Sequence, residues 1–213
     1  MQTFDYCERL DSSFWAEPIN ALSNIFFIVT AILALYYLFK RSTTAPKLLS
    51  LLLISILIFI GVGSFLWHTY AVRWAELADV IPIAIFLHLY IFVFFRYMLL
   101  KSFSISLFIV GIFIFLNYLF ESFVNLSIFN GSIAYLPALL FLIFMNLLTH
   151  EKREYHDLRL ATSIFVISLI FRSVDFIVCD VIAIGTHAFW HAFNAIMLFL
   201  LIKLFIDRSQ IAH

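Results

Sequence analysis

Residues 185–206 read GTHAFWHAFNAIMLFLLIKLFI, a stretch long enough to cross a lipid bilayer as one helix. Its first turns place two histidines, His187 and His191, four residues apart, so both side chains lie on the same helix face. Polar side chains inside a membrane are costly and usually serve a function. The two histidines therefore need a partner that compensates for their burial.

The whole chain has the composition of a membrane protein. Its 213 residues are 64% hydrophobic and only 12% charged, and its mean hydropathy is +1.07. A soluble domain of this length could not bury so much apolar surface, so the sequence predicts an integral membrane protein. The 13 basic and 13 acidic residues balance, and nothing in this balance indicates a nucleic-acid partner.

Seven segments meet or approach the length of about 20 residues that a spanning helix needs. They are residues 19–39, 47–69, 77–98, 102–120, 132–149, 159–179 and 185–206. The short connections predict antiparallel neighbours, and the chain contains no linker and no repeat. We therefore expect an all-α membrane protein with one domain over residues 1–213, a seven-transmembrane helix bundle that follows an acidic extramembrane segment, residues 1–18.

Basic residues concentrate at one end of this expected bundle. That end holds Lys40, Arg41, Lys47, Arg96, Lys101, Lys152, Arg153, Arg159, Lys203 and Arg208. The opposite end holds only Arg9 and Arg73, while Arg172 falls inside the sixth span. Because cytoplasmic loops are enriched in Lys and Arg, the N-terminus is predicted outside or in a lumen and the C-terminus in the cytoplasm. The sequence leaves open whether the membrane is a plasma or inner membrane or an endomembrane.

The expected topology brings polar residues from three helices to one membrane depth. Ser64 and His68 lie one turn apart near the outer end of the second span, and Asp79 opens the third. His187 and His191 open the seventh span. Ionisable groups at such depth usually face the bundle interior and mark functional sites.

Three neutral imidazoles from two helices suit a zinc ion. Zinc held by three protein ligands keeps a fourth position for water, which is typical of a catalytic site, and it can lower the pKa of that water to about 7. A histidine pair alone is weak evidence, because a membrane histidine is more often a hydrogen-bonded packing residue. The third histidine and the nearby Asp79 favour the metal.

Other intramembrane polar residues are expected to satisfy one another. Arg172 and Asp175 are three residues apart in the sixth span, a spacing that predicts an internal ion pair. Asn20, Ser23 and Asn24 in the first span are expected to form hydrogen bonds between helices rather than to take part in chemistry.

Several motifs together resemble the alkaline ceramidase family, which belongs to a superfamily of seven-helix membrane hydrolases that includes the adiponectin and progestin receptors. They are GSFLWH at 63–68, Asp79, FRSVDFIVC at 171–179 and THAFWH at 186–191, with DYCE at 5–8 and AEPINALSN at 16–24 closest to the ceramidase branch. The resemblance follows the chain in order over nearly its whole length. No single motif is specific, but the combination is.

The resemblance implies a zinc amidohydrolase. His68, His187 and His191 would hold the zinc, with Asp79 near the zinc-bound water and Ser64 near the substrate carbonyl. The substrate would be a membrane lipid, ceramide or another N-acyl lipid, cleaved at its amide bond to a fatty acid and a sphingoid base or amine. Ceramide itself comes only from the resemblance.

The resemblance also implies a calcium site in the acidic N-terminal segment, with Asp5, Glu8, Glu17 and the backbone carbonyl of Tyr6 as ligands. The sequence departs from the family pattern here. The segment between Glu8 and Glu17 is short, and the expected Asn ligand is replaced near Leu10, so Asp11 is a candidate substitute. Because calcium prefers six to eight oxygens, a solvated acidic segment remains an equal alternative.

Two further residue roles follow from the family pattern. It pairs Cys7 with Cys179, both on the expected outer side, where an oxidising compartment would permit a disulfide. Two unrelated thiols are the alternative. Asp175 also matches a family position, and the pattern allows it to orient a zinc-ligand histidine by accepting the second N–H of the ring.

Two other functions compete with hydrolysis. A receptor of the adiponectin/progestin type would share the helices and the zinc site, but such receptors place the N-terminus in the cytoplasm, opposite to the prediction from the basic residues. A proton-coupled transporter would also use intramembrane His and Asp. The chain shows neither the inverted repeat nor the glycine-broken helix pair that favours a transporter.

Overall fold

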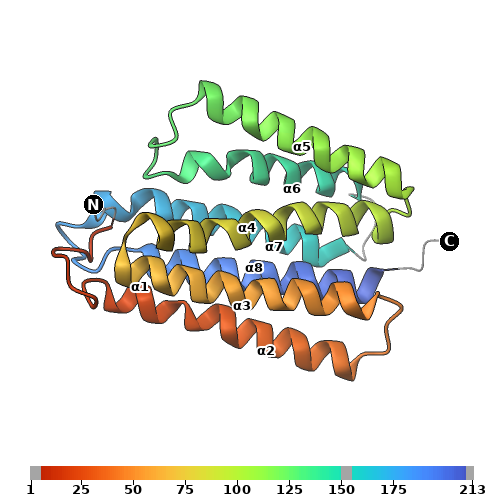
Figure 1. Ribbon diagram of the computed structural model, residues 1–213, viewed down its shortest axis with the longest axis horizontal. Coiled ribbons are helices and arrows are strands. Elements are labelled where there is room, and N and C mark those ends of the chain that lie inside the picture. Colours follow the sequence, from red (N-terminus) through yellow and green to blue (C-terminus); the bar gives the residue numbers. More distant parts are fainter. Residues whose placement is uncertain (1–5, 150–154, 210–213) are drawn as a thin grey trace.

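The computed structural model describes residues 6–149 and 155–209, which form a bundle of helices that run back and forth along one long axis (Figure 1). The helices are α1 (Pro18–Ser23), α2 (Ile25–Lys40), α3 (Lys47–Tyr70), α4 (Arg73–Val93), α5 (Phe103–Phe123), α6 (Leu136–Leu148), α7 (His156–Val174) and α8 (His187–Arg208). Short helical turns, Phe94–Met98, Ser132–Tyr135 and Asp175–Val178, extend α4, precede α6 and follow α7.

Six helical segments are long and apolar enough to cross a membrane. They are Pro18–Lys40, Lys47–Tyr70, Arg73–Met98, Phe103–Phe123, His156–Val178 and His187–Arg208, and Ser132–Leu148 is a shorter apolar helix. Large apolar side chains such as Phe108 and Phe115 on α5 point outward, as lipid-facing residues do. The protein is thus a multi-pass helical integral membrane protein, and each predicted span coincides with a helix to within a few residues.

Helix α8 lies at the centre of the bundle. It packs against α2, α3 and α7, whereas α5 lies at the periphery (Figure 1). Asn194, Leu201 and Phe205 along α8 are buried. The helix that carries two of the histidines is therefore surrounded by protein rather than by lipid.

Helices α3 and α4 approach each other closely beside the candidate site. Gly63 faces the backbone of Ala78, and a Cβ atom at position 63 would overlap the Ala78 carbonyl group. Ser64 and Asp79, each one residue further along, are held side by side by this contact. A glycine is required here because no side chain fits between the two backbones.

The start of α4 corrects one sequence prediction. The helix begins at Arg73 rather than near residue 77, so Asp79 lies nearly two turns inside it instead of at its opening. Ala71, in the left-handed conformation with φ 48°, ends α3 and allows a tight turn. Arg73 and Glu76 form an ion pair at 2.8 Å in the first turn of α4, a polar start that a hydropathy pattern does not detect.

We expect Gly63→Ala to destabilise the protein, because the added methyl group forces α3 away from α4. Overpacking of this kind costs about 1–3 kcal/mol, and each kcal/mol shifts the unfolding temperature by about 2–4 °C in a chain of this size. Thermal unfolding in detergent measures the effect. Gly111→Ala is the matched control, since nothing lies within 4 Å of a Cβ at that helical position; equal unfolding temperatures for the two variants would contradict the close approach.

Candidate metal centre and lipid cavity

Three histidines from α3 and α8 meet inside the bundle. His68 lies in the last turn of α3, His187 is the first residue of α8, and His191 follows one turn later. Their side chains are 1–2% exposed, and their ring centroids are 4.6–5.0 Å apart. One nitrogen from each ring lies within 4.8 Å of the others, so the group could hold a metal ion. No other such cluster of His, Cys, Asp or Glu occurs among residues 6–149 and 155–209.

Two of the rings are oriented by hydrogen bonds from the N-terminal part of the chain. Nδ1 of His68 lies 2.5 Å from Oε2 of Glu17, and Nδ1 of His191 lies 2.6 Å from the Ser23 hydroxyl. Nε2 of His68 is buried with no protein partner, and Nε2 of His191 lies 3.4 Å from the Ser64 hydroxyl. Partners of this kind fix the orientation of metal-binding imidazoles and leave the opposite nitrogen for the ion.

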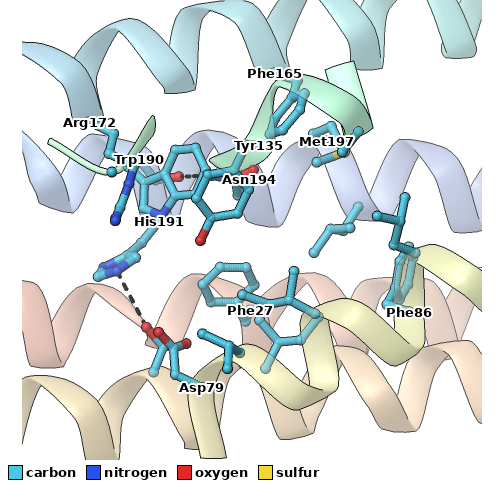
Figure 2. Close-up of a pocket in the computed structure, with 18 of the residues that line it drawn as sticks. Phe27, Asp79, Phe86, Tyr135, Phe165, Arg172, Trp190, His191, Asn194 and Met197 are labelled. Carbon is cyan, nitrogen blue, oxygen red and sulfur yellow. Dashed lines mark hydrogen bonds between the residues drawn. The ribbon is translucent and has the colours of Figure 1, made fainter. Parts of the chain in front are cut away.

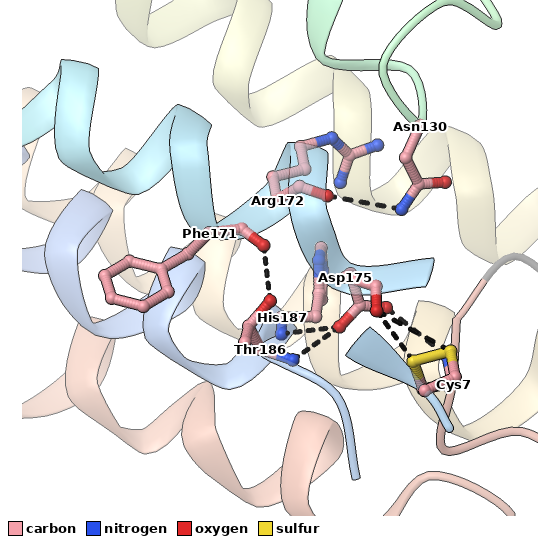
Figure 3. The surroundings of a disulfide bond; sticks show 8 residues. Cys7, Asn130, Phe171, Arg172, Asp175, Thr186 and His187 are labelled. Atoms are coloured by element: carbon pink, nitrogen blue, oxygen red, sulfur yellow. Dashed lines mark hydrogen bonds between the residues drawn. A yellow bond between two sulfur atoms is a disulfide. The ribbon is translucent and has the colours of Figure 1, made fainter. Parts of the chain in front are cut away.

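Asp175 serves the backbone of α8 rather than a histidine ring, which corrects the ring-orienting role considered from the family pattern. Its Oδ1 accepts the backbone N–H groups of Thr186 and His187 at 2.6 and 2.9 Å (Figure 3). The first N–H groups of a helix have no partner within the helix, and Gly185, at φ +65°, turns the chain so that they reach the carboxylate. Nδ1 of His187 has no protein partner.

The predicted ion pair between Arg172 and Asp175 is wrong. The side chain of Arg172 points away from Asp175 (Figure 3), because the 3-10 turn that begins at Asp175 ends the regular spacing of α7. Its guanidinium instead stacks over Tyr135 and Trp190, with the guanidinium carbon 5.4 and 5.3 Å from the ring centroids.

A cavity of about 440 Å³ opens beside the histidines. Figure 2 shows Arg172, His191 and Asp79 at one end of it, while Phe86 and Met197 line the other end. Ser64 also lines the polar end. The structure therefore brings Ser64 and Asp79, the two residues expected to take part in chemistry, to the same cavity as His187 and His191.

The N-terminal segment packs over the histidine end of the bundle. The Tyr6 ring lies against His68 and His187, with centroids 4.8 and 4.1 Å apart, and its hydroxyl accepts the Trp67 Nε1–H at 3.3 Å. Burial raises the pKa of Tyr6 to about 12, so the phenol stays protonated at neutral pH. Cys7 and Cys179 form a disulfide, with their Cα atoms 5.3 Å apart, that ties the segment to the chain between α7 and α8.

The residues predicted as calcium ligands have other partners in the described part of the segment. Both Glu8 carboxylate oxygens accept backbone N–H groups at the start of α1, and Asp11 is exposed and bonds the Ser13 N–H at 2.8 Å. Glu17 contacts His68 and pairs with Arg9. Asp5 lies outside the described residues, and calcium binding stays a prediction.

Glu17 stays ionised although it is almost fully buried. Burial alone would raise its pKa, but the hydrogen bonds to His68 and Arg9 outweigh that effect and lower the pKa of this carboxyl. Arg9 Nε donates to Glu17 Oε1 at 2.5 Å. The predicted hydrogen bond between helices is confirmed for Ser23, which bonds His191. Sequence reasoning missed that its partner is a histidine of the site, and it missed Arg9 altogether, since the residues that the two meet lie 59 to 168 positions away in the sequence.

A comparison with known protein families identifies the family of the chain. The family model described as Ceramidase matches residues 2–210, a range that includes the three histidines, Ser64, Asp79 and the N-terminal segment. A search of curated proteins found no match. Since the family match covers almost the whole sequence, the chain belongs to the ceramidase family.

Proposed function

We propose that the protein is a zinc-dependent intramembrane amidohydrolase that cleaves ceramide or a related N-acyl lipid to a fatty acid and a sphingoid base or amine. The observation that carries this proposal is the group of three buried histidines at the polar end of a cavity that is otherwise apolar. Membership of the ceramidase family supports the same reaction class.

The histidine group fits zinc. Nε2 of His68 and Nδ1 of His187 are buried polar atoms without a protein partner, and such atoms are rare unless something binds them. Neutral imidazoles are typical zinc ligands, and three of them leave one position open. Zinc bound there would polarise the substrate carbonyl and make a water molecule more acidic.

The cavity suits a lipid with one polar group and long apolar chains. From Asp79 to Ile91 its lining follows α4 over a rise of about 18 Å, at 1.5 Å per residue. Phe141, Leu142 and Met145 of α6 form another part of its wall. An amide held near His191 would leave room for an acyl chain along the apolar part.

Asp79 is assigned the proton transfer, and Ser64 is assigned the contact to the oxyanion. The Asp79 carboxylate accepts a proton from the attacking water and returns it to the leaving nitrogen, as a general base and then a general acid. The Ser64 hydroxyl donates a hydrogen bond to the carbonyl oxygen as negative charge develops there. The close approach of α3 and α4 at Gly63 holds the two side chains in register.

We expect Asp79→Asn to lower turnover of an N-acyl lipid about 10²- to 10⁴-fold while the protein retains its zinc. The amide cannot accept the proton, but no histidine is altered. Detergent-purified protein would be assayed for released fatty acid on a panel of ceramide and other N-acyl lipids, and for metal content. His68→Ala should lose both activity and metal. Unchanged turnover in Asp79→Asn would remove this residue from the mechanism.

We further propose that the histidine end faces the outside or a lumen. Tyr6, the first described residue, lies against the histidines, and α8 runs from this end of the bundle to the other, where it ends at Arg208 (Figure 1). The connections that carry Lys40, Arg41 and Lys101 lie with the end of α8, and basic loops favour the cytoplasm.

An epitope tag at the N-terminus should therefore be cleaved by external protease in intact cells, or in intact sealed vesicles of lumenal-side-out orientation. A tag at the C-terminus should be protected until the membrane is opened. The reverse pattern would favour the orientation of the adiponectin/progestin receptors over that of a ceramidase-like hydrolase.

A further inference from the structure

Arg9 is a buried cation beside the metal centre. It is 3% exposed, and its guanidinium donates to Glu17 at 2.5 Å and to the backbone carbonyl of His68 at 2.9 Å. The carbonyls of Thr69 and Asp11 lie 3.5 Å from the same guanidinium. One side chain thus holds both the C-terminal end of α3 and the carboxylate that orients His68.

The described N-terminal residues do not fit calcium in this arrangement. Calcium prefers six to eight oxygen ligands. Oε1 of Glu17 accepts from Arg9 while Oε2 lies against His68, and both oxygens of Glu8 accept backbone N–H groups. The Tyr6 backbone carbonyl accepts the backbone N–H of Arg9 at 3.2 Å. Each of these oxygens already faces a hydrogen-bond donor or a histidine ring.

We propose that the Arg9 guanidinium takes the place of a calcium ion as the cation of the N-terminal segment, and that Arg9 is a positioning residue for His68. The positive charge balances the buried Glu17 carboxylate, which would otherwise be an uncompensated charge. Glu17 then holds Nδ1 of His68, and Nε2 faces the metal. The protein binds its zinc without calcium.

The geometry makes a specific demand on residue 9. A guanidinium is a planar group with several donors in fixed directions, so it reaches Glu17 and the His68 carbonyl at once. A lysine ammonium keeps the charge but not this fork. Arg9→Lys should therefore restore only part of what Arg9→Gln loses, whereas a purely electrostatic role would let lysine restore all of it.

The test measures two quantities, the zinc per chain after dialysis against a weak chelator and the unfolding temperature. Each is measured once with added calcium and once with a calcium-selective chelator. The wild-type protein should give the same values in both conditions. Arg9→Gln should lose about 10- to 100-fold in zinc affinity and unfold at lower temperature. Arg73→Gln is the matched control, because Arg73 is an exposed arginine at the same end of the bundle.

The proposal would be overturned if added calcium raised the unfolding temperature or the zinc content of the wild-type protein. It would also be overturned if Arg9→Gln bound zinc as tightly as the wild-type protein does. Should Arg9→Gln fail to fold, the calcium response of the wild-type protein and of Arg9→Lys still decides. If the wild-type protein bound no zinc in either condition, the proposed zinc-dependent hydrolysis would be contradicted. The claim that the N-terminal segment folds without calcium would still be tested by the unfolding temperatures.

A second inference comes from Arg172 and rests on the proposed function. Arg172 contributes the one Lys or Arg side chain to the cavity lining, and it has no carboxylate within 4 Å in the described part of the chain. Its Nε is buried without a partner. Stacking on Tyr135 and Trp190 holds the guanidinium in place, at the same end of the cavity as Asp79 and His191 (Figure 2).

A guanidinium fixed at the polar end of a cavity is suited to an anion, and a planar fork is suited to a carboxylate or phosphate. Ceramide carries no charge. We infer that the preferred substrate carries a negative group on its amine portion, close to the scissile amide, as an N-acyl amino acid does. Arg172 would bind this group while the acyl chain fills the apolar part of the cavity.

The test compares N-acyl serine with N-acyl ethanolamine of the same chain length, in wild-type protein and in Arg172→Gln. Turnover and thermal stabilisation by each lipid are both measured. Arg172→Gln should raise the KM for N-acyl serine about 10- to 100-fold and leave that for N-acyl ethanolamine nearly unchanged. The anionic lipid should also stabilise the wild-type protein more than the neutral one does.

The inference would be overturned if Arg172→Gln changed the KM for the two lipids equally. It would also be overturned if free fatty acid inhibited Arg172→Gln less than it inhibits the wild-type protein. In either case Arg172 would contact the acyl portion, which both lipids share. Selective stabilisation by the anionic lipid without hydrolysis of either lipid would support the binding site and contradict the proposed reaction.

Discussion

The burial of three imidazoles between α3 and α8 is the constraint on which the rest of the site depends. An unpartnered polar group inside a membrane protein is costly, so the rings must share a partner or form separate hydrogen bonds. In this chain two of the rings have hydrogen-bond partners, and the three rings together form a group that could hold a metal ion. The outer nitrogens of His68 and His191 have partners in Glu17 and Ser23, while the nitrogens that face inward converge. This division is what a metal ion requires.

The supports of the histidines come from three different parts of the chain. Glu17 precedes α1, Ser23 ends α1, and Asp175 follows α7. Asp175 holds the backbone of His187 and also accepts the Cys7 N–H at 3.3 Å, beside the disulfide. The N-terminal segment is therefore part of the site although it lies outside the spanning helices. Its polar residues cover the end of the bundle where the histidines lie.

Much of the fold and part of the site could be predicted from the sequence. Continuous apolar stretches give the spans, because lipid demands length and hydrophobicity in every helix. His187 and His191 are recognisable by their spacing on one helix face. His68 follows from the depth at which its span ends.

The partners of the histidines could not be predicted, for a physical reason. A contact such as Arg9 with the His68 carbonyl depends on how a loop folds back over the bundle, and no periodicity encodes this. The Arg172–Asp175 spacing was misleading because the helix changes to a tighter turn at Asp175. The start of α4 was placed too late because its first turn is charged.

The most direct test of this account is the metal itself. X-ray absorption and elemental analysis of the purified protein should show one zinc per chain with three histidine nitrogens at about 2.0–2.1 Å and one further oxygen ligand. Single substitutions of His68, His187 and His191 should each abolish that signal. A protein that is folded and free of metal, or a zinc ion bound without these three imidazoles, would contradict the central claim.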